Sequence, residues 1–360
     1  IYDCALVVDH VAGRAWLSGR EGGSPRARRL LADAALNPRP PACGPFAVQG
    51  GIRSNLPQEA YLDRFRRIQD YIQRGDCYQV NLTRRFSVTA TGDAWGAYLE
   101  LRRRNPAPFS AFLNTPGVRI LCASPERFLR VRRGQGATCP IKGTIRRLAE
   151  PEADRRQREA LLASPKDRAE NLMIVDLLRN DLGRSCRTGS IRVPRLFGVQ
   201  SFAGLHHLVS TVTGGLGPGT DALDLFRGCF PGGSVTGAPK IRAMQIIEEL
   251  EGERRSVYCG SIGYVGFDGA MDTNIAIRTM VHARGELSFW AGGGIVADSG
   301  YASEADEVDV KVRAMRDVAE AFRLPRPYAE GAQFLGTRGR QLLPLSPDNN
   351  ADRRRCSMRS

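Results

Sequence analysis

The chain has 360 residues, with 42% hydrophobic and 7% aromatic side chains, a composition typical of a soluble globular protein. No apolar run approaches the roughly 18 residues that a helix needs to cross a bilayer, which excludes a helical membrane protein. The net charge of +14 raises the alternative of a basic nucleic-acid-binding protein.

The distribution of charge argues against nucleic acid as a partner. Residues 323–360 contain eight arginines against three acids, so part of the excess lies in a Pro-rich terminal stretch. Elsewhere the arginines are interspersed with Asp and Glu, as in Asp154–Glu159, and no basic stripe with interleaved aromatic residues occurs. We therefore interpret the excess as a solvated, arginine-rich surface.

The cysteines predict a cellular location, and the first residue predicts where the chain begins within its family's N-terminal region. The nine cysteines are scattered, with no C-x-x-C pair and no Cys/His metal spacing, which predicts reduced thiols and a cytoplasmic location. The chain starts at Ile1 and shows no secretory signal, so we expect a truncated N-terminal region.

The first half of the chain predicts more strands than helices. Residues 1–20 predict two strands around a turn, and a Pro- and Gly-rich stretch over 37–51 predicts a linker. Pro57 opens a helix with a periodic apolar face that ends at Gly75. Alternating polar and apolar residues from Tyr78 predict a strand. Further strands are expected at 110–114, 118–123 and 127–133.

The second half alternates runs of strands with single helices. Ser164, Pro165 and the acid Asp167 form a helix start. Helices are expected at 164–183, 221–229, 239–251 and 303–322. Strands are expected within 190–215 and at 258–267, 272–283 and 286–292. Consecutive runs of strands favour an α+β fold with large antiparallel sheets over a doubly wound parallel sheet.

Lysine is almost absent: of the 52 basic residues only four are lysines. Three of these lie in unusual strings, Lys142 in Pro-Ile-Lys-Gly-Thr, Lys240 in Thr-Gly-Ala-Pro-Lys, and Lys311 on the last predicted helix. Unlike arginine, a desolvated lysine can lose its proton and act as a nucleophile or base. These lysines are therefore candidates for chemistry, with chance placement near motifs as the alternative.

Acidic residues on two predicted helices are candidate ligands. Glu170 and Asp176 belong to a helix that is apolar nearly all round, so we expect its acids to be buried, where a carboxylate must be paired, protonated or bound to metal. Glu304 and Glu307 share a helix face with Lys311, and two carboxylates one turn apart form half of a Mg²⁺ site. The alternatives are a structural Glu–Arg pair and a solvated helix face.

A glycine run and a histidine pair mark further candidate positions. Gly292–Gly294 follows a predicted strand, and successive glycines let backbone amides approach an anion such as a carboxylate. No phosphate-loop or dinucleotide motif is present, so a nucleotide is not implied. His206 and His207 are adjacent on a predicted strand, so their side chains point to opposite faces and one can face a site. A plain turn and a structural histidine are the alternatives.

Nine strings, in chain order, resemble the chorismate-utilising enzymes, the family of anthranilate, aminodeoxychorismate, isochorismate and salicylate synthases. The resemblance covers about residues 50–322. The strings are Gly75–Asn81, Ala123–Phe128, Pro140–Thr144, the helix around Glu170, His207–Ser210, Phe230–Lys240, Cys259–Tyr264, Met271–Thr279 and Ala291–Asp298.

Lys142 decides between branches of this family. Anthranilate synthases carry a small residue at this position, whereas aminodeoxychorismate synthases carry Pro-Ile-Lys-Gly-Thr, as this chain does. The resemblance implies that Lys142 attacks C2 of chorismate while the C4 hydroxyl leaves, and that ammonia then adds at C4, a step towards 4-aminobenzoate and folate. Glu126 would protonate the departing oxygen. Anthranilate formation, and isochorismate formation from water, are the alternatives.

The resemblance also implies the remaining site residues and the fold. Three carboxylates would hold Mg²⁺ on a substrate carboxylate: Glu170, Glu304 and Glu307. The other carboxylate and the ring would be bound by Thr236, Tyr264, Arg278, Gly293, Gly294 and Lys311. His207 would lie near the ring as a catalytic residue. The implied fold is a large antiparallel β-sandwich wrapped by helices.

The chain departs from the family pattern in its tryptophan site and in the absence of a glutaminase, and these departures bear on the expected domains and partner. Pro108, Phe109 and Ser110 match one wall of the tryptophan site found in many relatives, but the other wall is absent. No cysteine has the Gly-x-Cys-x-Gly setting of a glutaminase, so a glutamine amidotransferase subunit is the expected ammonia source. We expect an N-terminal remnant and linker (1–50), a chorismate-binding catalytic domain (51–323) and a disordered Pro/Arg-rich tail (324–360).

Overall fold

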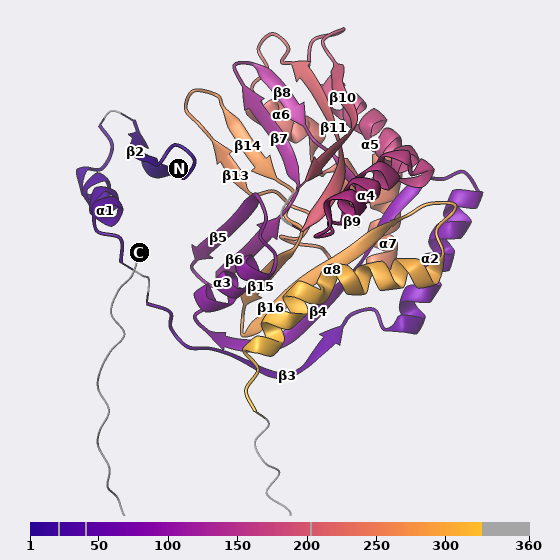
Figure 1. The fold of residues 1–360 in the computed structure, drawn as a ribbon, viewed down its shortest axis with the longest axis horizontal. Coiled ribbons are helices and arrows are strands. Elements are labelled where there is room, and N and C mark those ends of the chain that lie inside the picture. The colour runs from indigo at the N-terminus through magenta and orange to yellow at the C-terminus, as the bar shows by residue number, and fades with distance from the viewer. Residues whose placement is uncertain (21, 40–41, 202–203, 326–360) are drawn as a thin grey trace, which may run out of the picture. The chain divides into compact units, whose positions relative to one another are not determined.

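The computed structural model describes residues 1–325, except 21, 40–41 and 202–203 (Figure 1). Residues 1–324 form one compact unit. The predicted disordered tail lies almost entirely outside the described residues, so its disorder stays a prediction.

Two seven-stranded sheets make up most of this unit, and their strands pair antiparallel throughout. In the first sheet the order is β12 (Gly237–Ala238), β4 (Gln79–Gly92), β16 (Glu286–Ile295), β15 (Thr279–Ala283), β6 (Val118–Ser124) and β5 (Phe109–Thr115), with β3 (Phe46–Ser54) also paired to β4. Antiparallel pairing of this extent confirms the predicted α+β class.

The second sheet collects strands from the middle of the chain. Its order is β10 (Arg192–Ser201), β11 (Leu205–Gly215), β8 (Gln135–Thr138), β7 (Arg127–Arg132), β14 (Met271–Asn274) and β13 (Gly263–Val265), with β9 (Ile141–Arg146) also paired to β11. A separate hairpin of β1 (Cys4–Asp9) and β2 (Arg14–Gly19) confirms the two strands predicted at the start.

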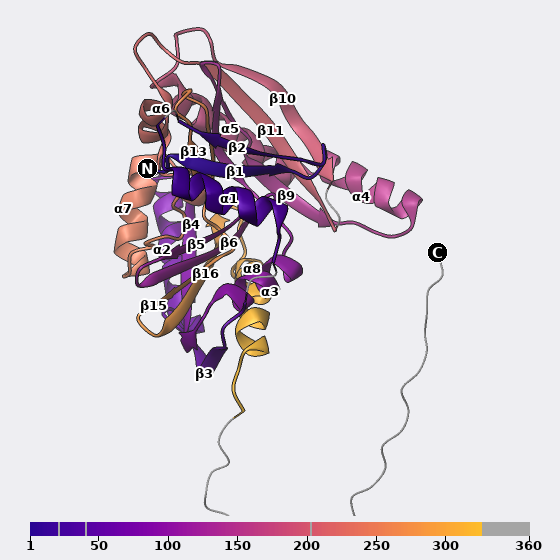
Figure 2. The ribbon, with the colours of Figure 1, turned by 90° about the vertical axis from the view of Figure 1, so that its left-hand side faces the viewer.

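Helices pack on both sheets. They are α1 (Pro25–Leu36), α2 (Gln58–Gln73), α3 (Trp95–Arg104), α4 (Pro151–Ala163), α5 (Pro165–Gly183), α6 (Ala222–Cys229), α7 (Lys240–Glu251) and α8 (Tyr301–Ala321), with a short 3₁₀ turn η1 (Gly233–Val235). On the first sheet α8 packs on β16, and α2 and α7 pack on β4 (Figure 2). On the second sheet α5 packs on β9 and β11. Across the described part of the chain, none of the helices is long and apolar enough to span a bilayer.

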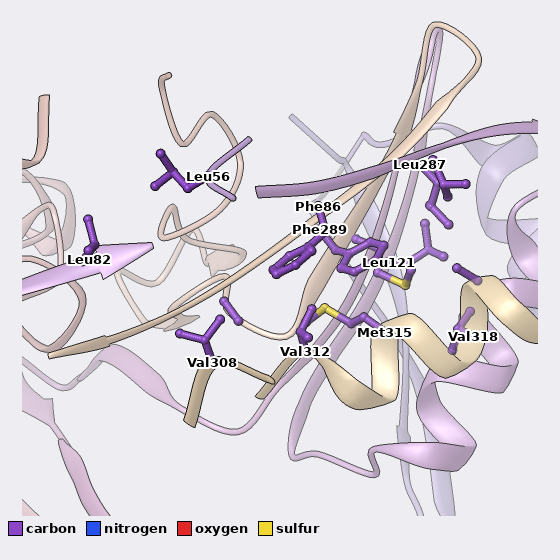
Figure 3. Close-up of a cluster of buried hydrophobic side chains, with 14 of the residues drawn as sticks. Leu56, Leu82, Phe86, Leu121, Leu287, Phe289, Val308, Val312, Met315 and Val318 are labelled. Carbon is purple, nitrogen blue, oxygen red and sulfur yellow. The ribbon is translucent and has the colours of Figure 1, made fainter. Parts of the chain in front are cut away.

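One apolar stripe fixes α8 on the first sheet. Val308, Val312 and Met315 are fully buried at the predicted 4-3 spacing and face a layer that contains Phe86 and Phe289 (Figure 3). The two phenylalanines are paired in register, and their rings stack 5.8 Å apart. Because helix neighbours one turn apart share a face, the same packing carries the preceding turn of α8, which bears the predicted metal ligands, towards the sheet.

Helix α5 begins where the sequence predicts. The Ser164 hydroxyl accepts a hydrogen bond from the Asp167 amide at 3.3 Å, and Pro165 occupies the first turn, where its missing N–H is no loss. Ile174, together with Val175 and Leu178, is buried in the second core. Helix α5 thus belongs to the second sheet, whereas α8 belongs to the first.

The prediction that α5 is buried all round is wrong. Leu172 remains 46% exposed, and Asp176 lies in solvent, where it pairs with Arg179 at 2.8 Å. Asp176 therefore is not the buried acid that the sequence predicts. The apolar pattern could not reveal this, because it does not specify how many neighbours surround the helix.

Other departures concern element boundaries. Helices α1, α3 and α4 are not predicted from the sequence, and the predicted linker ends earlier than expected because β3 begins at Phe46. The expected strand over 272–283 is interrupted between β14 and β15, where Arg278 adopts φ +51°. The expected strand at 258–267 is reduced to β13. Alternation of residue types could not show these breaks, because they depend on local backbone conformation.

Lys240, a candidate for chemistry in the sequence, forms a buried ion pair. Its Nζ lies 2.5 Å from Asp181 Oδ2 and donates to the Cys229 carbonyl oxygen at 2.7 Å. The side chains of Lys240 and Asp181 are 8% and 1% exposed. Asp181 lies in the last turn of α5 and Lys240 begins α7, so the pair joins the two helices.

Removing only the lysine should destabilise the fold strongly. Lys240→Met leaves the Asp181 carboxylate buried without its cation, which typically costs about 3–5 kcal/mol of unfolding free energy. Replacing both residues, as Lys240→Met with Asp181→Leu, should recover much of that loss because no unpaired charge remains. Urea unfolding of the three proteins measures these differences. A single variant as stable as the wild type would show that the pair is not structural.

Candidate active site

Strands β9 and β11, which pair with each other, carry the predicted site residues Lys142 and His207. Thr144 on β9 is paired with His207 on β11, and its hydroxyl oxygen lies 2.8 Å from His207 Nδ1. Lys142 precedes Thr144 at an irregularity in this pairing. Burial lowers the pKa of His207, and the charge of Arg278 acts in the same direction. The neighbouring His206 contacts Asp154 instead, at 3.1 Å.

The glycine of the Pro-Ile-Lys-Gly-Thr string is required by the backbone. Gly143 has φ +77°, a conformation that residues with a side chain rarely adopt. A Cβ atom at this position would also lie 2.9 Å from Cγ of Asp167, in the first turn of α5. Gly143 therefore permits the close approach of β9 and α5 that places Lys142 beside the acids of that helix.

The Lys142 amine lies half-buried among charged groups from other elements. Burial lowers its pKa, and the charge of Lys311 acts in the same direction, while the charges of Glu170, Glu126 and Glu307 oppose the shift. The net direction is downward because desolvation disfavours the ammonium form more than the carboxylates favour it. A lowered pKa increases the unprotonated fraction, which carries the lone pair that a nucleophile needs.

Glu126 lies in the turn between β6 and β7 and is 6% exposed. Burial raises the pKa of its carboxyl group to about 7, although the Ser234 hydroxyl donates to Oε1 at 2.8 Å and the charge of Lys142 also opposes the shift. A carboxyl group with this pKa is about half protonated at pH 7, so it can donate or accept a proton.

Glu304 lies against the glycine run of β16. It is 4% exposed; its Oε1 accepts from the Ser299 hydroxyl at 2.7 Å, whereas its Oε2 is buried without a hydrogen-bond partner. A Cβ atom on Gly293 would lie 2.6 Å from that Oε2 and 3.6 Å from Oε2 of Glu307. Glycine is therefore needed at position 293 because two carboxylates approach the strand there.

Lys311 links this acidic pair to the strand and to Arg278. Its Nζ lies 2.5 Å from Glu307 Oε1 and donates to the Gly292 carbonyl oxygen at 2.8 Å. The Arg278 guanidinium donates to the Lys311 carbonyl oxygen at 3.0 Å. Arg278 keeps φ +51°, a backbone conformation that persists only where the surroundings hold it in place. Burial lowers its pKa.

The three predicted metal ligands come from two helices. Burial raises the pKa of Glu170 on α5, the charge of Lys142 opposes this, and Glu307 on α8 raises the pKa further. Burial likewise raises the pKa of Glu304. Among the described residues no group of three His, Cys, Asp or Glu side chains is arranged as a finished metal site. The unpartnered, buried Glu304 Oε2 nevertheless fits a cation that would complete its coordination.

The two remaining predicted substrate ligands differ in exposure: Thr236 is buried and Tyr264 is exposed. Thr236 is buried, its hydroxyl donates to the Gly232 carbonyl oxygen at 2.9 Å, and its carbonyl accepts from the Asn81 amide, whose residue is paired with Gly294. Tyr264 lies on the edge strand β13 with 64% exposure. The structure thus ties Thr236 to the glycine run and leaves Tyr264 in solvent.

The residues that resemble part of a tryptophan site lie at the start of β5. Pro108 precedes the strand, the Ser110 hydroxyl donates to the Ala107 carbonyl oxygen at 2.9 Å, and the Arg127 guanidinium lies 5.0 Å from the centre of the Phe109 ring. Strand β5 is an edge strand of the first sheet.

Sequence reasoning missed Gln79. This residue is fully buried, and neither polar atom of its carboxamide has a hydrogen-bond partner. A Cβ atom on Gly294 would lie 2.9 Å from its Cδ. An unpaired buried amide is costly, so the position suits a polar ligand at the glycine run. In the sequence, Gln79 belongs to the string Gly75–Asn81, but as a polar residue in an alternating strand it resembles an ordinary solvent-facing position.

Comparisons with known proteins agree with this geometry. The family model for chorismate binding enzymes matches residues 1–317. The chain belongs to this family. Aminodeoxychorismate synthase component 1 from Klebsiella aerogenes is 52% identical over 312 residues, which cover 87% of this chain and 68% of the relative. The protein of that name from Escherichia coli is 49% identical with the same coverage, and anthranilate synthase component 1 from Aquifex aeolicus is 44% identical over 74% of this chain and 54% of the relative.

Solved structures confirm the fold class of this family member. Anthranilate synthase component I from Streptococcus pneumoniae matches with a TM-score of 0.77 and 34% identity, over 87% of this chain and 72% of that one. The menaquinone-specific isochorismate synthase from Escherichia coli matches with a TM-score of 0.69 at 21% identity, over 85% of this chain and 72% of that one, a likeness of fold alone. The resemblance noted in the sequence is thereby confirmed at the level of family and fold.

The raised pKa of Glu126 predicts a pH-dependent stability. The folded-state pKa of about 7 lies above the ordinary value of 4.5, so the stabilising effect of the bound proton is fully present below pH 4.5 and is lost as the pH rises through 7. Relative to Glu126→Gln, the wild type should lose up to about 3 kcal/mol of unfolding free energy over this interval, at 1.36 kcal/mol per pKa unit. Urea unfolding at several pH values tests this, and a difference that does not change with pH would contradict the assignment.

Proposed function

We propose that this chain converts chorismate and ammonia into 4-amino-4-deoxychorismate through a covalent adduct on Lys142, a step towards 4-aminobenzoate and folate. The observation that carries the proposal is a half-buried amine with a lowered pKa, within electrostatic range of a carboxyl group, Glu126, that titrates near neutrality. The roughly half-identical relatives named aminodeoxychorismate synthase component 1 support the choice of reaction.

The first step forms the adduct. The unprotonated Lys142 amine attacks C2 of chorismate, the ring double bonds shift, and the C4–O bond breaks. Protonated Glu126 donates its proton to the departing oxygen, so water leaves in place of hydroxide. General acid help of this kind is worth roughly 10²–10⁴-fold, and the pKa of about 7 keeps enough of the acid form at neutral pH.

The second step releases the lysine. Ammonia attacks C4, the double bonds shift back, and the C2–N bond breaks, returning Lys142 as a neutral amine. The new C4 ammonium gives its extra proton to the Glu126 carboxylate. Each residue thus returns to its starting protonation state, and the net reaction exchanges the C4 hydroxyl group for an amine with release of water.

The acids of α5 and α8 are proposed to hold Mg²⁺ on a carboxylate of the substrate. Glu170, Glu304 and Glu307 would supply the ligands, and the unpartnered Glu304 Oε2 supports this choice. When bound, the ion would neutralise the substrate carboxylate and fix its orientation. Arg278 and Lys311, which are tied to each other, would bind the second carboxylate beside the glycine run.

A glutamine amidotransferase subunit is proposed to supply the ammonia. The designation component 1 of the relatives implies a second component. No cysteine of this chain lies in the Gly-x-Cys-x-Gly setting of a glutaminase nucleophile. Glutamine hydrolysis requires an activated nucleophile, so it is assigned to that second protein.

Substitution of Lys142 should stop the proposed reaction. With chorismate, Mg²⁺ and ammonium, Lys142→Ala should lower the yield of 4-amino-4-deoxychorismate by about a hundredfold or more and can redirect product to anthranilate, because ammonia then reaches C2 directly. Lys142→Arg keeps the charge but cannot supply a neutral amine, so it should not restore activity. Chromatography separates the two products. Wild-type output from the arginine variant would contradict a nucleophilic role.

Removal of a metal-binding charge should weaken Mg²⁺ binding. Glu170→Gln and Glu307→Gln keep the shape of the side chain but not its charge, so each should raise the apparent Kd for Mg²⁺ at least about tenfold, or 1.4 kcal/mol, in the presence of chorismate. Calorimetric titration measures this independently of turnover. The exposed Glu159→Gln on α4 is the matched control. Equal titrations for all four proteins would assign Glu170 and Glu307 a structural role.

The purified chain should use ammonium but not glutamine. Product should form with ammonium at high pH, where free ammonia is abundant, and adding the amidotransferase subunit should switch on glutamine use. The partner should also stabilise the chain, since it binds the folded state. Turnover of glutamine by the pure chain alone would require a glutaminase site within it and would contradict the assignment.

A further inference from the structure

One largely buried arginine has no part in the proposed reaction. Arg255 lies shortly after the end of α7, and its side chain is only 12% exposed. A guanidinium group is always charged and carries five N–H donors in a planar fork, so it is rarely buried unless these donors and the charge are paired. The contacts of Arg255 therefore indicate what the position does.

The Arg255 guanidinium group uses as many contacts as it has N–H donors. Nε and Nη2 donate to the two carboxylate oxygens of Glu251, at 2.9 and 2.6 Å. Nη2 also donates to the Asn81 carbonyl oxygen at 2.6 Å. Nη1 donates to the Val235 carbonyl oxygen at 2.5 Å and to Cys259 Sγ at 3.6 Å. A lysine has three donors on a single nitrogen and could not make this set of contacts.

Glu251 extends this network along strand β4. Its side chain is 4% exposed, and its Oε1 accepts from the amide and from the hydroxyl group of Thr83, at 2.9 and 2.8 Å. Asn81, which Arg255 contacts, lies two residues earlier on the same strand. The ion pair of Glu251 and Arg255 therefore binds two backbone groups on one side of β4.

This ion pair takes the place of a neighbouring strand. Among the described residues, the pairing of β12 with β4 ends at Val80, and the pairing of β3 with β4 begins at Phe86. The carbonyl of Asn81 and the amide of Thr83 lie between these points, and a buried backbone group without a partner is costly. The side chains of the ion pair supply the missing partners.

The backbone groups that Arg255 fixes belong to the proposed substrate site. Val235 directly precedes Thr236, whose carbonyl oxygen accepts from the Asn81 amide at 2.8 Å. Asn81 is paired with Gly294 on β16. Because the N–H and C=O groups of Asn81 both point away from β16, the two residues form a non-hydrogen-bonded pair, and the amide of Gly294 points away from β4.

The glycine run shows which groups lie on that side of β16. Gly292 is paired with Thr83 and, two residues from Gly294, has the same orientation. Its carbonyl oxygen accepts from Lys311 Nζ at 2.8 Å. The Gly294 amide thus points to the side on which Lys311, with Arg278, is proposed to bind the second carboxylate of the substrate.

We propose that Arg255, paired with Glu251, is a positioning residue that holds Thr236 and the Gly294 amide in place for the second carboxylate of chorismate. The inference deepens the proposed function and rests on it. Arg255 acts through the backbone groups that it fixes, on β4 and at η1. Small displacements of groups that bind a substrate are costly, so loss of these contacts should weaken binding.

The chemical groups of the proposed reaction come from the other sheet. Lys142 lies on β9, and Glu126 directly precedes β7. Neither takes part in the hydrogen bonds of Arg255 and Glu251 described above. The affinity for chorismate, measured without turnover, is therefore the quantity that reports on Arg255.

The test is calorimetric titration with chorismate and Mg²⁺ in the Lys142→Ala protein, without ammonia, so that no reaction follows binding. Adding Arg255→Lys keeps the charge but removes the fork of donors, and the Kd for chorismate should rise about tenfold or more. Arg85→Lys is the matched control, because Arg85 on β4 is also paired with two carboxylates, Glu253 and Glu286, which lie outside the glycine run. It should leave the Kd unchanged.

The same titration separates positioning from stability. If Arg255 only stabilised the fold, Arg255→Lys would lower the binding stoichiometry, because part of the protein would be unfolded, but the folded molecules would keep the original Kd. Thr83→Val is the milder second variant, since it removes only the hydroxyl contact to Glu251. It should raise the Kd about threefold and decides the matter if Arg255→Lys does not fold.

Two results would overturn the positioning role. One is an unchanged Kd in Arg255→Lys or, where that variant does not fold, in Thr83→Val. The other is an equal rise of the Kd in the control Arg85→Lys. Failure of the proposed function looks different: the Lys142→Ala protein itself would then not bind chorismate, and the role assigned to Arg255 would be refuted together with the substrate.

Discussion

The structure depends on one constraint: a lysine and several carboxyl groups are removed from solvent together in the candidate active site. Burial favours the neutral form of four groups in the site. It lowers the pKa of Lys142 and raises the pKa of Glu126, Glu170 and Glu304. The neighbouring charges reduce these shifts without reversing them. The site therefore holds an amine and carboxyl groups whose neutral forms burial favours, and the unpaired Glu304 Oε2 is an oxygen atom that a cation can complete.

The two sheets and their helices maintain this arrangement through close backbone approach and one buried ion pair. Glycine at positions 143 and 293 lets β9 reach α5 and lets β16 reach the acids of α8. The pair between Lys240 and Asp181 joins α7 to α5, and the apolar stripe of α8 sets the rotation of that helix on the first sheet. A site assembled from both sheets needs such connections, because its members are far apart in the chain and each would prefer water on its own.

Much of the site was predictable because its residues occur in short strings with distinct chemistry. The scarcity of lysine pointed to Lys142, and the i, i+3, i+7 spacing placed Glu304, Glu307 and Lys311 on one helix face. What failed depends on tertiary surroundings. The pattern of α5 could not show that Leu172 and Asp176 face solvent, and no local signal revealed that Lys240 pairs with an acid 59 residues away. Gln79 was missed because alternation alone does not distinguish a buried polar face from an exposed one.

The most direct test of Lys142 as the nucleophile is mass spectrometry of the intact chain after rapid quenching. The chain is mixed with chorismate and Mg²⁺ without ammonia, so that the second step cannot occur. A mass gain equal to chorismate minus one water, located by digestion on the peptide that contains Lys142, is the predicted result. An adduct on another residue, or no adduct in a chain that forms aminodeoxychorismate once ammonium is added, would contradict covalent catalysis by this lysine.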